Sequence, residues 1–158
     1  MKRILELLLL ILISQTVYAQ GSVNNELTHL EKTLKAGGIS NIVVLRRPDD
    51  VVTRISVTPK VLREVPAPTQ KYEIDVNESR STLLLRWLKQ AQLKPTEKSP
   101  DLRWGMLFID RDGKEIGSIF SDRFGKIGNV SGENVEFSDP RLIEAIRTLV
   151  GSQARHRF

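Results

Sequence analysis

The chain has 158 residues, a formal net charge of +5 and no cysteine. Without cysteine, it has no disulfide, lipid-modified cysteine anchor, thiolate metal site or cysteine nucleophile. Its basic residues are dispersed rather than clustered, which is typical of a solvated surface and disfavours nucleic acid as a partner.

The N-terminal residues have the three regions of a secretory signal peptide. Lys2 and Arg3 form a short positive start, residues 7–13 are an unbroken apolar run, and residues 17–19 fit the small-x-small cleavage pattern. The alternative is a membrane anchor, but a spanning helix needs about 20 apolar residues and this run is much shorter. We therefore predict cleavage after Ala19, a periplasmic or secreted location, and a mature chain without a stable membrane anchor.

The mature chain is predicted to form a single domain over residues 20–151, followed by a flexible basic tail over residues 152–158. Leucines at helical spacing predict a first helix that ends at Gly37-Gly38. Apolar alternation predicts strands, and Thr58-Pro59 and Asn77 are signals for helix starts. The first half then contains, in chain order, this helix, strands over 42–45 and 51–57, a short helix after Thr58, a strand over 71–76 and a main core helix between Asn77 and Lys94.

Turn signals after Leu102 predict a meander of four strands. The strands cover residues 102–110, 115–122, 127–130 and 135–138, and Asp139-Pro140 begins a last helix that ends at Gly151. This order predicts an α+β fold with a mainly antiparallel sheet, a C-terminal β-meander and about three packing helices.

Asp110 and Asp112 raise the question of a metal-binding loop. A calcium loop that began at Asp110 would have a lysine at position 5, a glycine at position 4 instead of 6, and a serine at position 12. Asp112-Gly113 between two apolar strands is instead a strong signal for a hairpin, in which both central residues of the turn have positive φ. We therefore predict a hairpin tip and no metal site.

The turn also predicts the register of the hairpin. The opposed side chains are compatible in size and chemistry: Met106 with Ile119, Gly105 with Phe120, and Ile109 with Ile116. One misfit is a like-charge pair of Asp110 and Glu115. Both faces of the hairpin are apolar in this register, so either a helix crosses the second face as well, or part of that face is a contact site for a partner.

The groups that most catalytic mechanisms require are missing from the sequence. His29 and His156 are the only histidines, so a serine triad would depend on one of them as its base. There is no G-x-S-x-G elbow, no H-E-x-x-H zinc motif and no phosphate-binding glycine loop. We therefore predict no catalytic residue, metal site or cofactor.

The leading hypothesis is an exported, non-enzymatic binding module of the cell envelope, such as an inhibitor, an immunity-type protein or an accessory of a larger assembly. Its partner would be a protein or an anionic envelope component. Two alternatives stay open. One is a carboxylate-based hydrolase that acts on envelope polysaccharide, and the other is a structural subunit that self-associates through a free sheet edge.

The predicted contact lies on the turns of the meander. Phe124 is an aromatic residue in a turn that needs none, with Arg123 before it and Lys126 after it. Aromatic rings flanked by basic residues are typical of binding hot spots. Arg111, in the turn before, completes the predicted partner-binding set. In the alternative interpretation, Phe124 folds back and covers the edge of the core.

We predict that the exported protein begins at Gln20, because signal peptidase cuts after the small residue at position 19. Intact mass spectrometry of the exported form measures this directly. A product that retained residues 7–13 would contradict the prediction.

Overall fold

The computed structural model describes residues 23–53, 56–64 and 66–154. The predicted signal peptide and the last four residues of the predicted tail lie outside this part of the chain. None of the helices described here has the length and apolar character needed to cross a membrane. Within the described residues, four helices and a single seven-stranded antiparallel sheet confirm the predicted α+β class.

The helices begin where the sequence predicts. Thr58 Oγ1 accepts from the N–H of Val61 at 3.4 Å, and Asn77 Oδ1 accepts from the N–H of Arg80 at 2.9 Å, so both act as N-caps. The elements are, in chain order, a first helix over residues 23–35, β1 (Ile39–Arg46), α2 (Pro59–Arg63), β2 (Gln70–Asp75), α3 (Glu78–Gln90), β3 (Leu93–Pro95), β4 (Trp104–Asp110), β5 (Glu115–Ser121), β6 (Ile127–Val130), β7 (Glu133–Phe137) and α4 (Arg141–Ala154).

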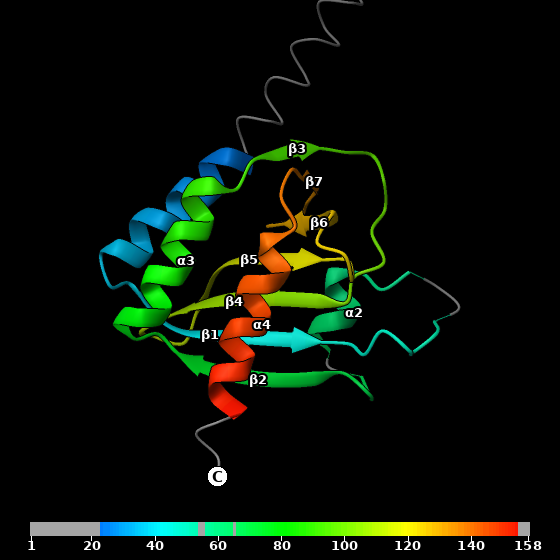
Figure 1. Cartoon of the computed structure of the whole chain (residues 1–158), viewed down its shortest axis with the longest axis horizontal. Coiled ribbons are helices and arrows are strands. Elements are labelled where there is room, and N and C mark those ends of the chain that lie inside the picture. The colour runs from blue at the N-terminus through cyan, green and yellow to red at the C-terminus, as the bar shows by residue number, and fades with distance from the viewer. Residues whose placement is uncertain (1–22, 54–55, 65, 155–158) are drawn as a thin grey trace, which may run out of the picture.

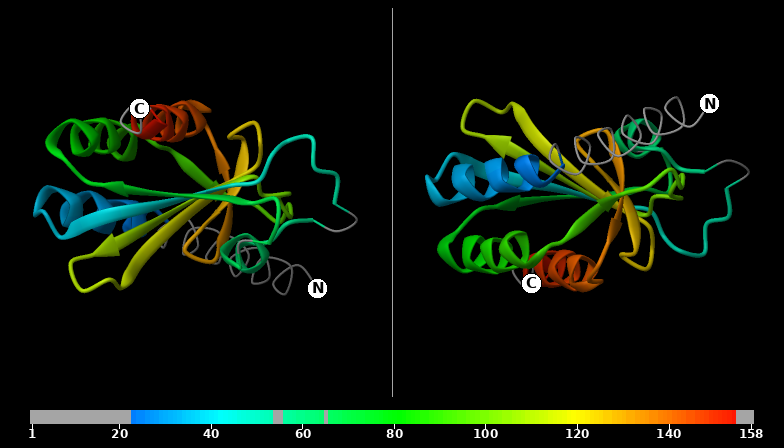
Figure 2. Two further views of the ribbon diagram at one scale, coloured as in Figure 1. Left: turned by 90° about the horizontal axis from the view of Figure 1, so that it is seen from below. Right: turned by 90° about the horizontal axis from the view of Figure 1, so that it is seen from above.

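The strands lie in the order β2-β1-β4-β5-β6-β7-β3 (Figure 1). The β4–β5 hairpin is therefore inside the sheet, and β2 and β3 are its two edges. α3 and α4 cover one face, whereas α2 lies on the opposite face (Figure 2). We call these the helical face and the α2 face.

The helical face carries the larger core, which the first helix shares with α3 and α4. Trp87 of α3 is 6% exposed, and its ring centroid lies 6.5 Å from that of Phe137 in β7. The first helix approaches the sheet closely at Gly117, where a Cβ would come within 2.8 Å of Leu30. Further fully buried members of this core are Ile42, Ile74, Leu84, Met106, Phe108 and Ile119.

The α2 face has a second, smaller core. Leu62 of α2 packs there with Leu45, Val57, Leu102 and Phe120, and none of these side chains is more than 1% exposed. A helix therefore does cross the second face of the hairpin. This part of the face is core rather than a free contact surface.

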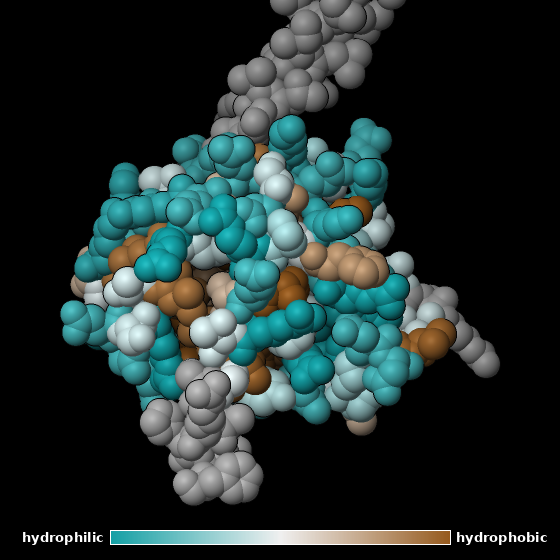
Figure 3. All heavy atoms as spheres, viewed as in Figure 1, coloured by the Kyte–Doolittle hydropathy of each residue, from teal (hydrophilic) through white to brown (hydrophobic). Residues whose placement is uncertain are grey.

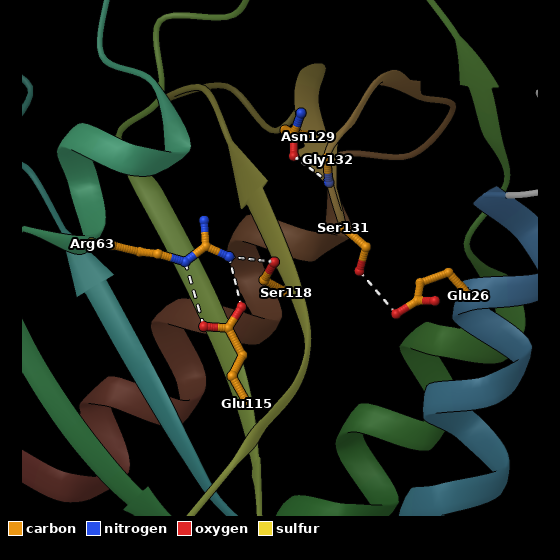
Figure 4. Close-up of polar contacts among 7 residues, drawn as sticks. All are labelled: Glu26, Arg63, Glu115, Ser118, Asn129, Ser131 and Gly132. Atoms are coloured by element: carbon orange, nitrogen blue, oxygen red, sulfur yellow. Dashed lines mark hydrogen bonds and ion pairs between the residues drawn. The ribbon is translucent and has the colours of Figure 1, made fainter.

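Polar contacts hold α2 on the sheet. Arg63 donates from Nη2 to Glu115 Oε1 at 2.6 Å and to Ser118 Oγ at 2.9 Å, and both partners belong to β5 (Figure 4). The same guanidinium lies 4.7 Å from the ring centroid of Phe120. One side chain thus joins the short helix to the central hairpin through an ion pair and a ring contact.

Two of the predicted hairpin pairs are confirmed. Met106 lies opposite Ile119, and Gly105 lies opposite Phe120. The glycine is needed because a Cβ at position 105 would come within 2.7 Å of the Phe120 ring. The ring therefore covers the backbone of the neighbouring strand, as the sequence predicts.

The third predicted pair is wrong, because a register shift precedes Ile109. Ile109 faces Glu115 instead of Ile116. The N–H of Asp110 donates to the carbonyl of Lys114 at 3.0 Å. The bulge therefore removes the predicted like-charge pair of Asp110 and Glu115 and leaves the glutamate to bind α2.

Three other boundaries differ from prediction. The described residues of segment 51–57 form a loop instead of a strand. No strand is predicted at residues 93–95, yet β3 pairs there with β7, and its proline is tolerated because β3 is an edge strand. The last helix is predicted to end at Gly151, but α4 continues to residue 154, and Gly151 lacks the left-handed conformation that is common at helix ends.

We predict that Trp87→Ala lowers the free energy of unfolding by about 3–5 kcal/mol, the range for loss of a large buried aromatic side chain. Chemical denaturation measures the change. Arg86→Ala, one residue away on the exposed side of α3, is the control and should change stability by less than about 0.5 kcal/mol. Equal effects of the two substitutions would contradict the central position of Trp87.

Candidate functional site

Two turns of the meander share a sequence pattern. Residues 110–114 read DRDGK, and residues 122–126 read DRFGK. Asp110 Oδ1 accepts from the backbone N–H groups of residues 112 and 114 at 2.9 and 2.8 Å. Asp122 Oδ1 accepts from those of residues 124 and 126 at 3.2 and 2.9 Å. The two turns are therefore built in the same way, by an aspartate that binds its own loop.

Each of these turns has one residue in the left-handed conformation. Gly113 has a φ of 80° and Gly125 a φ of 71°, whereas Asp112 has no positive φ, in contrast to the prediction for a two-residue turn. The loops are instead longer turns that close with a glycine. Asp110 is thus a turn-forming residue, and no group of three or more metal-ligating side chains lies together within the described ranges.

The second turn is held by contacts on its backbone and presents Phe124 to solvent. Gly125 packs on the start of α4, where a Cβ would come within 2.9 Å of Ile143. Phe124 is 56% exposed, and the guanidinium of Arg123 lies 4.4 Å from its ring centroid. Because the matching turn makes the same bonds with Asp112 at this position, turn geometry does not require the ring. Phe124 does not fold back over the core.

An ion pair between a buried arginine and a partly exposed aspartate holds the loop beside this turn. Arg103, only 7% exposed, donates from Nε and Nη2 to Asp101 Oδ2 at 3.1 and 2.6 Å. Its Nη1 donates to the carbonyl of Val51 at 2.8 Å, and Asp101 Oδ1 accepts from the N–H of Val57 at 3.0 Å. These bonds tie both ends of segment 51–57 to the start of β4. The segment is therefore a pinned loop instead of the predicted strand.

Two adjoining hollows, of about 370 and 410 Å³, lie between this loop and the second turn. Both are bordered by Asp49, Asp101, Arg103 and Arg123. Among the described residues, the two large hydrophobic side chains that are exposed are Val52, at 94%, and Phe124. Each borders one of the hollows. We call this region, where β1 and β5 finish, the loop end of the sheet.

Two of the three carboxylates that border the hollows, Asp101 and Asp122, serve structural bonds, whereas the third, Asp49, is exposed. Both oxygens of Asp101 are occupied by Arg103 and by a backbone N–H, and Asp122 Oδ1 accepts two backbone N–H bonds. A glycosidase needs one carboxyl group to move a proton and a second to act as base or nucleophile. The bonds of Asp101 and Asp122 disfavour these two carboxylates as such a pair, but they do not involve Asp49.

The predicted partner-binding residues lie at two separate places. Arg123, Phe124 and Lys126 belong to the second turn and lie together at the loop end. Arg111 belongs to the first turn, at the opposite end of β5, where its guanidinium approaches Gly37. Arg111 is therefore not part of this site. No sequence motif predicts the ion pair of Asp101 and Arg103. The recurring D-R-x-G-K pattern, in contrast, is a sequence signal that could have predicted the two similar turns.

A further hollow of about 270 Å³ lies between α3 and α4, on the face where apolar surface is visible between these helices (Figure 3). Leu83, Trp87 and Ala145 contribute its apolar lining. Arg141 donates to Gln90 Oε1 at 2.8 Å and so bridges the two helices across it. We interpret this hollow as the seam between two packed helices.

Comparisons with known proteins give no guide to function. No family model, curated protein or solved structure matches the chain. Function is therefore inferred from the geometry of the loop end.

We predict that Asp101→Asn lowers the free energy of unfolding by about 1–3 kcal/mol, because it leaves the buried Arg103 without its anionic partner. The partial exposure of Asp101, at 44% of its side chain, keeps the loss below that of a fully buried pair. Proteolysis within residues 47–57 should accelerate in the same variant, since the loop loses its anchor.

Asp49→Asn is the matched control, because Asp49 borders the same hollows and is exposed. It should change neither stability nor the rate of cleavage. If Asp101→Asn also left both unchanged, the ion pair would not hold the loop.

Proposed function

We propose that the protein is a non-enzymatic binding module of the cell envelope and that it binds a protein partner through the loop end. The observation that carries the proposal is the exposure of Phe124 on a turn fixed by its own hydrogen bonds and by α4. The envelope location rests on the predicted signal peptide.

A rigid, exposed ring is well suited to binding. Covering it with a partner removes apolar area from water, a gain of roughly 1.5–3 kcal/mol for a large apolar side chain. Little conformational freedom is lost in return, because Asp122 and Gly125 already hold the turn and Arg123 already lies on the ring. The exposed Val52 extends the apolar surface across the hollows.

The charges around this surface favour a protein over a purely anionic component. Arg123 and Lys126 are exposed cations, but Asp49 and Asp101 border the same hollows as Arg123. The donors of Arg103 are already engaged by Asp101 and by backbone carbonyls. An apolar centre with a rim of both signs is the usual arrangement of protein–protein interfaces.

The matching turn supplies the substitution for the test. Phe124→Asp gives the second turn the residue that the first turn has at position 112, so the fold should tolerate it. Immobilised exported protein should retain an envelope protein after crosslinking, and Phe124→Asp should lose it. With that partner purified, calorimetry should show a loss of about 2 kcal/mol or more, roughly 30-fold in affinity.

Asp112→Ala, in the first turn, is the control and should bind like the wild type. Arg123→Ala should slow association and change its salt dependence, as expected for a charge at an interface rim. Unchanged binding by a folded Phe124→Asp variant would rule out the loop end as the contact. The exposed side of α3 around Thr82, Arg86 and Lys89 would then be the next surface to examine.

A further inference from the structure

The two edges of the sheet differ in their ability to accept another strand. On β3, the N–H of Thr96 donates to Asn134 of β7 at 3.0 Å, so Pro95 directs its nitrogen outward. Proline has no N–H, and the outer edge of β3 is therefore blocked. β2 carries no proline over its six residues, and no strand of the described part pairs with its outer edge (Figure 1).

Hydrogen bonds to β1 show which residues of β2 face outward. The N–H of Val76 donates to the carbonyl of Ser40 at 3.0 Å, so the even-numbered residues of this strand pair with β1. Lys71, Glu73 and Asp75 then direct their backbone groups outward. The carbonyl of Asp75 accepts from Arg80 Nη1 at 2.7 Å. Lys71 and Glu73 therefore form the part of the edge that is open to a partner.

Charged side chains on an edge usually discourage pairing, but this pair has opposite signs. Lys71 Nζ lies 2.7 Å from Glu73 Oε1, and the two side chains are 47% and 61% exposed. A second copy that lies antiparallel on the first, with the twofold axis at Tyr72, places Lys71 opposite Glu73 twice. The backbone direction agrees with this register, because both residues face outward.

We propose that a second copy of this chain pairs with β2 in this register, which joins the two sheets into one. Lys71 and Glu73 of each copy exchange backbone hydrogen bonds, and their four side chains alternate in sign across the seam. The two copies of Tyr72 meet at the axis as a cross-strand aromatic pair. The contact is small, so the dimer is weak and its population depends on concentration.

Neighbouring registers are less favourable. An axis at Glu73 opposes that residue to itself. It also opposes Lys71 to Asp75, but the backbone pairing there needs the Asp75 carbonyl that Arg80 occupies. An axis at Lys71 opposes two lysines. Like charges directly opposite each other destabilise a strand pair. Charge therefore disfavours the axis at Lys71, and charge together with the Arg80 bond disfavours the axis at Glu73, which leaves the register with its axis at Tyr72.

Charge reversal tests the proposal with an internal control. Lys71→Glu leaves two acidic side chains on the edge, and Glu73→Lys leaves two basic ones. By sedimentation equilibrium, each single variant should dimerise about tenfold or more weakly than the wild type. An equimolar mixture of the two should form a heterodimer, and the double variant with Lys71→Glu and Glu73→Lys should recover homodimers.

Heterodimer formation in the mixture would show that each single variant is folded and that only its strand pairing was impaired, because a misfolded variant would not regain association when the other variant is added.

Because the chain has no cysteine, an introduced cysteine can test the register of the two strands. Tyr72→Cys places two thiols opposite each other at about 4.5–5.5 Å between Cα atoms, within the range of a disulfide. That variant should crosslink rapidly on oxidation, and Lys94→Cys on the opposite edge should not.

Two results would overturn the proposal. One is a wild-type protein that stays monomeric up to about 1 mM, where weak complexes are populated. The other is a mixture of the two single variants that shows no association beyond that of each alone. Failure of Phe124→Asp to affect partner binding would leave this proposal intact, because the loop end and the β2 edge are separate surfaces.

Discussion

The central β4–β5 hairpin is apolar on both faces, and the rest of the structure depends on this constraint. Three helices bury one face, and α2 buries the other together with Val57 and Leu102. α2 has only five residues, so packing alone gives it a small contact area. Its arginine strengthens that contact, because Arg63 binds Glu115 and Ser118 and stacks on Phe120. The described residues of segment 51–57 form a loop instead of a strand, and Val57 at the end of the segment packs into the smaller core.

Burial of Arg103 has a similar consequence at the end of the sheet. A guanidinium that is 7% exposed requires acceptors, and Asp101 and the carbonyl of Val51 provide them. The acceptors come from two segments that are far apart in the chain, so the bonds of Arg103 join these segments beside the hollows. Rigidity of this kind lowers the entropic cost of binding. The same bonds also occupy both oxygens of the Asp101 carboxylate.

The paired turns show how a fold can keep its geometry and vary its surface. Both rely on an aspartate at the first position and a glycine at the fourth, and these residues satisfy the backbone of the loop. The residue at the third position contributes only its backbone N–H to those bonds. Its side chain can therefore differ, and it is Asp112 in one turn and Phe124 in the other. The two turns lie at opposite ends of β5. Only the second lies beside the hollows, and this separates Arg111 from the other predicted contact residues.

Local chemistry in the sequence was sufficient to predict the α+β class, the caps at Thr58 and Asn77, the meander and the position of Phe124 in a turn. These features depend on side chains that act within a few residues of each other. Only the tertiary structure decided the bulge before Ile109, the loop at 51–57, the edge strand β3 and the ion pair of Arg103. Each of these features involves contacts between groups far apart in the chain. Glu115, next to the bulge, binds Arg63 of α2, Arg103 donates to the carbonyl of Val51, and Pro95 of β3 lies opposite Val135. The sequence pattern shows which residues could make such contacts, but it does not show which residues they contact. Those partners are decided by how the two faces of the hairpin are covered.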